Sequence, residues 1–84
     1  MSDPTATALG LVTSIIRAIV DTEAAVTVRV TEAESCTLLE VEVAKSDVGK
    51  VVGSRGETAM AIRSILRAIG GRHKRKFIME IKDQ

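Results

Sequence analysis

Two glycines enclose a serine and an arginine at Gly53-Ser54-Arg55-Gly56. Because glycine has no Cβ atom, another chain can approach the backbone closely there. Ser54 can donate a hydrogen bond to a phosphate oxygen, and Arg55 can bind phosphate through its planar fork of donors. A helix starting after Gly56 would add free N–H groups and a positive dipole end. The four residues favour a clamp for a sugar-phosphate chain, although a helical turn that binds no ligand also uses glycines.

Basic side chains are concentrated around this glycine pair. The formal net charge is only +1, but residues 50–76 carry eight basic side chains and a single acidic one, Glu57. Residues 1–49 carry three basic and eight acidic side chains. Such a local excess attracts polyanions. The eight basic residues are Lys50, Arg55, Arg63, Arg67, Arg72, Lys74, Arg75 and Lys76.

Other chemistries have little support in the sequence. Cys36 is the only cysteine, so it has no partner for an internal disulfide or a metal site. His73 is the only histidine, and the sequence supports no Cys–His or His–carboxylate constellation with it. The glycine-lysine pattern of a P-loop is also absent from the sequence. We therefore expect neither an enzyme nor a cofactor. Phe77 is the only aromatic residue, which excludes surfaces that stack several bases on exposed rings.

The first half of the chain predicts a helix and a hairpin. Asp3 as N-cap and Pro4 in the first turn start the helix, and its apolar residues recur at helical spacing through about residue 21. Alternating apolar residues predict strands over 26–30 and 39–43. The turn between them makes an antiparallel hairpin with one face in water.

A short helix is predicted over residues 48–52. Ser46 or Asp47 can cap its N-terminus, and Gly53 ends it because glycine readily leaves helical geometry. A longer helix then begins after Gly56.

This longer helix is predicted to reach about Ala68 and to end at Gly70-Gly71. Residues 72–74 are predicted as a basic loop, and residues 77–81 alternate as a last strand. The order α-β-β-α-α-β contains a crossover long enough for parallel pairing. We expect one α+β domain spanning residues 1–84, with a three-stranded mixed sheet and helices packed on one face.

The run Asp47-Val48-Gly49-Lys50-Val51-Val52-Gly53-Ser54-Arg55-Gly56, followed by Ala59, Ile62 and Arg63, resembles the core motif of KH domains. The predicted element order is similar to that of type II KH domains. In its length and in its Asp-Val-Gly-Lys lead-in, the chain resembles the small bacterial KH proteins called KhpA. The likeness covers about residues 8–82.

This resemblance implies a groove for about four unpaired nucleotides of RNA, with the glycine loop on the phosphates. Val48, Val52 and Ile62 would form its apolar floor, and a loop at 71–75 its opposite wall. The expected RNA-contacting residues are Val48, Lys50, Val52, Gly53, Ser54, Arg55, Gly56, Ile62, Arg63, Arg72, Lys74 and Arg75.

The resemblance also implies partners. Proteins that resemble this chain form homodimers, associate with a larger Jag-type RNA-binding protein (KhpB), and are linked to post-transcriptional control of cell elongation and division. The expected function is single-stranded RNA binding in the cytoplasm, as a post-transcriptional regulator or RNA chaperone. No signal peptide or membrane span is predicted.

Two residues keep an alternative open. Glu57 and Met60 stand where basic residues are frequent in the family, and Glu57 opposes phosphate. The alternative is a protein-interaction module that keeps the KH shape with little RNA binding. Single-stranded DNA as the ligand also remains open.

Overall fold

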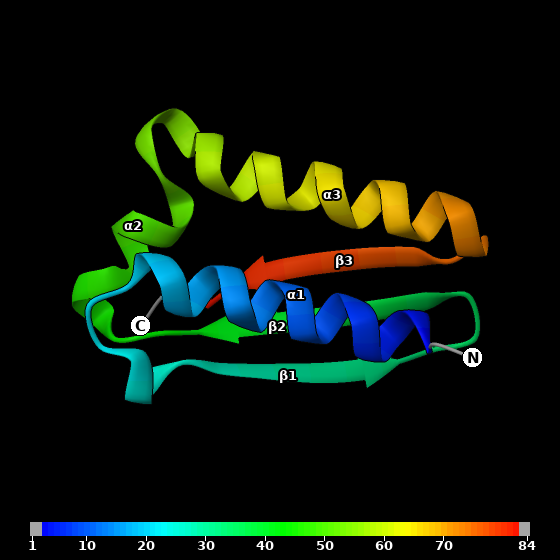
Figure 1. Cartoon of the computed structure of the whole chain (residues 1–84), viewed down its shortest axis with the longest axis horizontal. Helices are drawn as coiled ribbons and strands as arrows, with labels where there is room; N and C mark the ends of the chain where they lie inside the picture. The colour runs from blue at the N-terminus through cyan, green and yellow to red at the C-terminus, as the bar shows by residue number, and fades with distance from the viewer. Residues whose placement is uncertain (1–2, 83–84) are drawn as a thin grey trace.

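The computed structural model describes residues 3–82 and has the element order that the sequence predicts (Figure 1). Short 3₁₀ turns at Glu23–Ala25, Lys45–Asp47 and Ser54–Gly56 join some of the elements. The helices and strands are α1 (Pro4–Ile19), β1 (Thr27–Glu32), β2 (Cys36–Glu42), α2 (Val48–Val52), α3 (Glu57–His73) and β3 (Lys76–Ile81).

The three strands form one mixed sheet in the order β1-β2-β3. β1 and β2 pair antiparallel, with Val30 opposite Leu39, and β2 and β3 pair parallel, with Leu39 opposite Met79. The parallel pair is possible because α2 and α3 carry the chain back to the start of the sheet. This mixed topology and the α+β class are as predicted.

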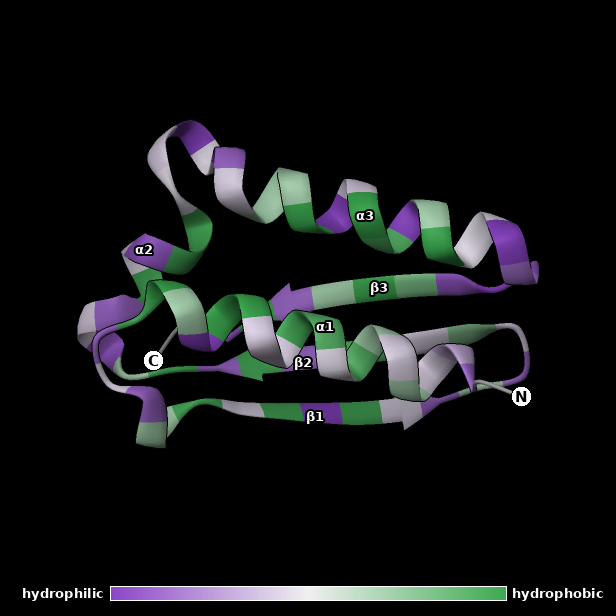
Figure 2. Cartoon of the chain, in the orientation of Figure 1, coloured by the Kyte–Doolittle hydropathy of each residue, from purple (hydrophilic) through white to green (hydrophobic). Residues whose placement is uncertain are grey.

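Helices α1 and α3 cover one face of the sheet (Figure 1). Alternate residues of β2 point toward them: Thr37, Leu39 and Val41 are buried, whereas their neighbours are only half-buried. Along α1 and α3 the buried residues fall at helical spacing, so each helix turns one apolar stripe toward the sheet. Figure 2 shows the corresponding alternation of hydrophobic and hydrophilic residues along both helices.

The start of α1 is as predicted. Asp3 is the N-cap, and its carboxylate accepts a hydrogen bond of 3.0 Å from the backbone N–H of Thr5. Pro4 occupies the first turn, where backbone N–H groups have no acceptor within the helix, so the N–H that proline lacks is not needed. The helix ends at Ile19, slightly before the predicted position near residue 21.

The predicted end of α3 is wrong. The helix continues through Gly70 and Gly71 to His73 and ends at Lys74, which has the left-handed conformation (φ 52°). A Cβ atom at Gly70 would overlap the main-chain carbonyl of Arg75. This glycine lets the turn after α3 pack directly on the helix. Gly70 is therefore a packing position within α3 and does not end the helix.

The predicted cap of α2 is also wrong. Asp47 stands at the N-cap position, but its side chain makes no capping hydrogen bond to α2. Its carboxylate, fully buried, instead accepts hydrogen bonds from the backbone N–H groups of Asp21 (3.2 Å) and Thr22 (3.0 Å). The side chain therefore ties the segment after α1 to the start of α2.

Candidate nucleic-acid interface

The glycine loop has a backbone that few residue types adopt. Gly53 (φ 81°), Arg55 (φ 57°) and Gly56 (φ 74°) all have positive φ, a region that is uncommon for residues other than glycine. A Cβ atom at Gly53 would also overlap Thr58 in the first turn of α3. Both glycines of the motif are thus needed for the tight joint between α2 and α3.

The loop projects from one end of the molecule (Figure 1). Ser54 and Arg55 are exposed, and no hydrogen bond or ion pair with any residue from 3 to 82 holds their side chains. The N-terminus of the 17-residue helix α3 follows directly. Free donors, a cation and a helix N-terminus therefore converge on one exposed turn, as an anion clamp requires.

Lys50 is less free than the sequence suggests. Its ammonium lies 3.3 Å from a carboxylate oxygen of Asp47 and 3.3 Å from one of Asp21. Its hydrogen bonds to Asp47 and then to Asp21 raise the pKa of Lys50. Two carboxylates thus offset its charge, so its attraction for a phosphate is weaker than that of Arg55.

The buried carboxylate of Asp47 holds α2 in place behind the loop. The backbone N–H of Thr22 is the main cause that lowers the pKa of Asp47, helped by the N–H of Asp21 and by Lys50, while burial acts in the opposite direction. Asp47 is ionised at neutral pH and accepts these donors in that form. The position of the glycine loop therefore depends on this charged anchor.

The three residues expected to form an apolar floor differ in exposure. The exposed fraction is 36% for Val52 and 3% for Ile62, and Val48 is half-buried. Val52 and Val48 can offer apolar surface to a ligand beside the loop. Ile62 belongs to the core and supports this surface from below.

The basic run lies at the other end of α3, and it is not a loop. Arg72 is in the last helical turn and Lys74 is the C-cap. Since a helix rises 1.5 Å per residue, about 25 Å separate them from the glycine loop. The predicted wall at 71–75 is therefore helix and tight turn. Arg72 lines a different hollow, together with Thr7 of α1.

Arg75 is committed to the fold. Its guanidinium donates a hydrogen bond of 2.6 Å to the hydroxyl of Thr37, which is buried, and others to backbone carbonyls of the β1–β2 turn. It also lies 3.9 Å from the carboxylate of Glu32. The side chain fastens the hairpin turn to the start of β3, so it is not free to bind a phosphate.

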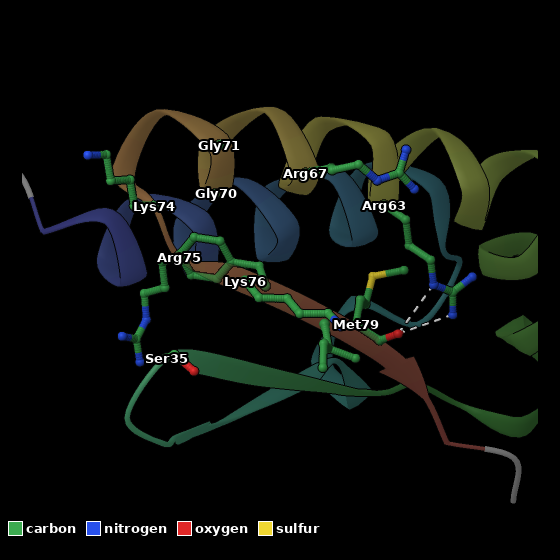
Figure 3. A pocket seen from close by; sticks show the side chains of 11 residues that line it. Ser35, Arg63, Arg67, Gly70, Gly71, Lys74, Arg75, Lys76 and Met79 are labelled. Carbon is green, nitrogen blue, oxygen red and sulfur yellow. Dashed lines mark hydrogen bonds between the residues drawn. The ribbon is translucent and has the colours of Figure 1, made fainter.

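A groove of about 560 Å³ runs between α3 and β3 (Figure 3). Arg63 lies at one end of it and donates two hydrogen bonds, of 3.3 and 3.1 Å, to the main-chain carbonyl of Met79. Of the predicted site residues, Arg63, Lys74 and Arg75 line this groove. Gly71 falls within the predicted wall at 71–75. The other lining residues are not among the predicted site residues: Ser35, Arg67, Gly70, Lys76, Phe77, Ile78 and Met79.

A signal for these residues exists in the sequence. Arg63, Arg67 and Lys74 follow the spacing of one helix face, provided that the helix continues past Gly70. Ending the helix at the glycine pair removed Lys74 from that face and concealed the pattern.

The family model described as "KhpA/KhpB, KH domain" matches residues 10–81. The match spans the loop, both helices around it and the whole sheet. The chain belongs to this KH-domain family. The predicted resemblance is therefore confirmed, and the observed fold is consistent with a type II KH domain.

Curated relatives extend this match over most of the chain. The RNA-binding protein KhpA of Borreliella burgdorferi is 42% identical over 87% of this chain and 89% of its own length. The proteins of the same name from Treponema pallidum and Caldanaerobacter subterraneus subsp. tengcongensis are each 38% identical, over 87% and 84% of this chain and 91% and 95% of their own lengths. These names describe binding, in agreement with the expectation that the chain is not an enzyme. None of the solved structures is significantly similar.

Residues 3–82 contain neither a candidate membrane span nor a cluster of metal-ligating side chains. Within this range no helix has the length and apolar character needed to cross a membrane. The same residues contain no group of three or more histidine, cysteine, aspartate or glutamate side chains placed to hold a metal ion.

Proposed function

We propose that the chain binds single-stranded RNA, with about four nucleotides held beside the Gly53–Gly56 loop. The observation that carries this proposal is the exposed loop itself. Its Ser54 and Arg55 side chains have no partner among the described residues and precede the N-terminus of α3. The names of the relatives support RNA as the polyanion. On this proposal the bases pack on the exposed Val52 and the half-buried Val48.

The binding energy on this proposal comes from phosphate contacts and aliphatic packing. The one aromatic side chain, Phe77, is only 8% exposed, so it cannot serve as an open stacking platform. We expect a single domain to bind in the micromolar range or more weakly. With about three phosphates neutralised, log affinity should fall with log salt at a slope of about −2.

The test replaces the two exposed residues of the loop. Ser54→Asp with Arg55→Asp should abolish binding of a tetranucleotide, measured by NMR titration, with an unchanged circular dichroism spectrum. Arg55→Asn removes only the cation, because asparagine tolerates the left-handed conformation. It should weaken binding about tenfold, the usual effect of losing one charged hydrogen bond.

Arg29→Gln is the matched control, because Arg29 is an exposed cation of β1 on the face of the sheet without helices. Its affinity should equal that of the wild-type chain. Full binding by the double variant with Ser54→Asp and Arg55→Asp would move the site away from the loop.

Partners and cellular role extend the same proposal. A small RNA binder of this kind can act in the cytoplasm as a post-transcriptional regulator or RNA chaperone, as a homodimer or together with a Jag-type KhpB protein. Exposed apolar side chains on α3, including Ile65 at 43%, support a protein contact beside RNA binding.

The competing function is protein interaction alone. Glu57, exposed in the first turn of α3, places a negative charge beside the loop and favours this reading. Crosslinking in cells followed by sequencing of the attached RNA separates the two functions. A module that only binds proteins would recover no RNA above a tagged control.

A further inference from the structure

Strand β1 is a free edge of the sheet. The strand order β1-β2-β3 gives β1 a neighbour on one side only, and Figure 1 shows it at the border of the sheet away from β3. The unpaired backbone groups of such an edge can bind another extended chain. The groove described above borders β3, on the opposite side of the sheet. The β1 edge is therefore separate from that groove.

The register of the hairpin identifies the backbone groups at this edge. The N–H of Ala33 donates a hydrogen bond of 2.8 Å to the carbonyl of Cys36. Because hydrogen-bonded pairs alternate along an antiparallel ladder, residues 27, 29 and 31 direct their backbone groups toward β2. Val28, Val30 and Glu32 direct theirs outward, and no backbone or side-chain group of residues 3–82 binds them there.

The two edges of the sheet differ in how they are protected. At β3, the side chain of Arg63 donates two hydrogen bonds to the main-chain carbonyl of Met79. Proteins also protect edges with proline, lysine or a bulge. β1 (Thr27–Glu32) contains no proline and no lysine, and its pairing with β2 has no bulge. An unprotected edge invites pairing with another chain, so its presence is understandable if the protein uses it for binding.

Apolar surface lies beside the edge on the side of α1. Val28 and Val30 are half-buried and pack against the core. Thr7 lines a hollow together with residues of α3, so the flank of α1 about half a turn away faces β1. Leu9 and Thr13 are on that flank, and both are half-buried. A strand added to β1 would place every second side chain on this surface.

Free acidic side chains stand at both ends of β1. Glu23 precedes the strand and Glu34 follows it, and both are exposed. Neither carboxylate has a hydrogen bond or an ion pair within the described part of the chain. Arg29, the one basic residue in β1, is opposite Glu40 in the register. The charges at the two ends of this edge therefore favour a basic partner.

From these observations we propose that β1 binds an extended basic segment of a partner protein, which joins the sheet as a fourth strand. The outward groups of Val28, Val30 and Glu32 pair with its backbone, and lysines or arginines at its ends face Glu23 and Glu34. A second copy of the chain fits less well. The antiparallel pairing of a two-fold dimer would bring Glu23 of one copy toward Glu34 of the other.

The probe is a peptide of about nine residues, the length of a strand with charged ends, in which valine and threonine alternate between terminal lysines. In an NMR titration of the full chain, it should shift the amides of Val28, Val30 and Glu32. It should also slow their exchange with water, because each N–H gains an acceptor. Unchanged amides at residues 27–32, or shifts confined to residues 53–56, would overturn the proposal.

Two modified peptides separate strand pairing from general attraction. Each is N-methylated at every second residue, so that one keeps the N–H groups that the other loses. Because only alternate N–H groups of an added strand face β1, one peptide should bind about tenfold more weakly, whereas the other should keep its affinity. Both peptides have the same charge and composition. Equal affinities of the two would overturn the proposal.

Variants of the chain test the basic character of the partner. Glu23→Gln with Glu34→Gln should weaken binding of the unmodified peptide about fivefold at low salt. The matched control is Glu57→Gln with Glu80→Gln, which removes two exposed carboxylates from α3 and β3 and should keep the affinity. Equal losses in the two variants would overturn recognition by the ends of β1. Amides of β1 that shift with protein concentration alone would assign the edge to a second copy and overturn the proposal.

Discussion

At the scale of single residues, buried and strained groups set the shape of the loop. Arg55 has a left-handed conformation, which costs roughly 1–2 kcal/mol for a residue with a Cβ atom. Its exposed guanidinium makes no hydrogen bond or ion pair within residues 3–82 that would offset this cost. An arginine at such a position is understandable if its side chain has a ligand, as the proposed phosphate clamp provides.

Asp47 gives a pH dependence to the same region. Its folded pKa is lowered, chiefly by the N–H of Thr22, so its contribution to stability is complete above the unfolded pKa of about 3.9 and is lost as the pH falls through the folded value. Asp47→Asn should reduce the free energy of unfolding at pH 7, measured with urea. The gap between the variant and the wild-type chain should shrink below about pH 4.

Asp21→Asn is the control for that measurement, since Asp21 is exposed and, among residues 3–82, its side chain forms an ion pair with Lys50 alone. It should alter the free energy of unfolding little. A constant gap between Asp47→Asn and the wild-type chain from pH 7 to pH 3 would show that the carboxylate does not act as a charged anchor.

At the scale of elements, the length of α3 decides what the interface contains. Because the helix continues to His73, it presents Arg63, Arg67 and Lys74 on one face and carries the basic run away from the glycine loop. The network of Arg75 then fixes the turn that leads into β3. The helix and the strand together form the walls of the groove.

The two adjacent glycines of α3 should respond to alanine in opposite ways. Gly70→Ala should lower the free energy of unfolding by about 1–3 kcal/mol, because its methyl group would overlap the carbonyl of Arg75. Gly71→Ala should raise it by about 0.5–1 kcal/mol, because its methyl group meets open space and alanine favours the helix. Urea titrations of both variants measure this. Stabilisation by Gly70→Ala would contradict the close packing of the turn on α3.

At the scale of the whole molecule, the two exposed sides of α3 have different character. The groove side carries Arg63, Arg67 and Lys74, whereas Arg72 lies on the other side, near Ala68 and Ile69. The other side carries the exposed residues Ala61, Ile65 and Ala68 and the half-buried Ile69, at the spacing of a helix face. A chain of 84 residues buries a smaller share of its surface on folding than a larger domain does, so pairing of two such faces would add to its stability.

The proposed homodimer predicts a specific effect at this second face. Ile65→Glu should convert a dimer into a monomer, because it would place two charges in an apolar contact. Sedimentation velocity over a range of protein concentrations measures the mass. Met60→Glu is the matched control, since Met60 is more exposed (63%) but lies on the groove side of α3. A monomeric wild-type chain, or an Ile65→Glu variant that remains dimeric, would exclude this face as the contact.

The sequence by itself determined the order of elements, the mixed sheet, the family and the position of the glycine loop. These follow from local patterns: the alternation of strands, the helical spacing of apolar residues, and the glycines at 53 and 56. Tertiary structure alone decided the end of α3 and the roles of Asp47 and Arg75. Gly70 is a helix stop by local propensity, yet contact with the Arg75 carbonyl makes it a packing site. The carboxylate of Asp47 binds N–H groups about 25 residues away, and the guanidinium of Arg75 reaches Thr37, so no local pattern records either partner.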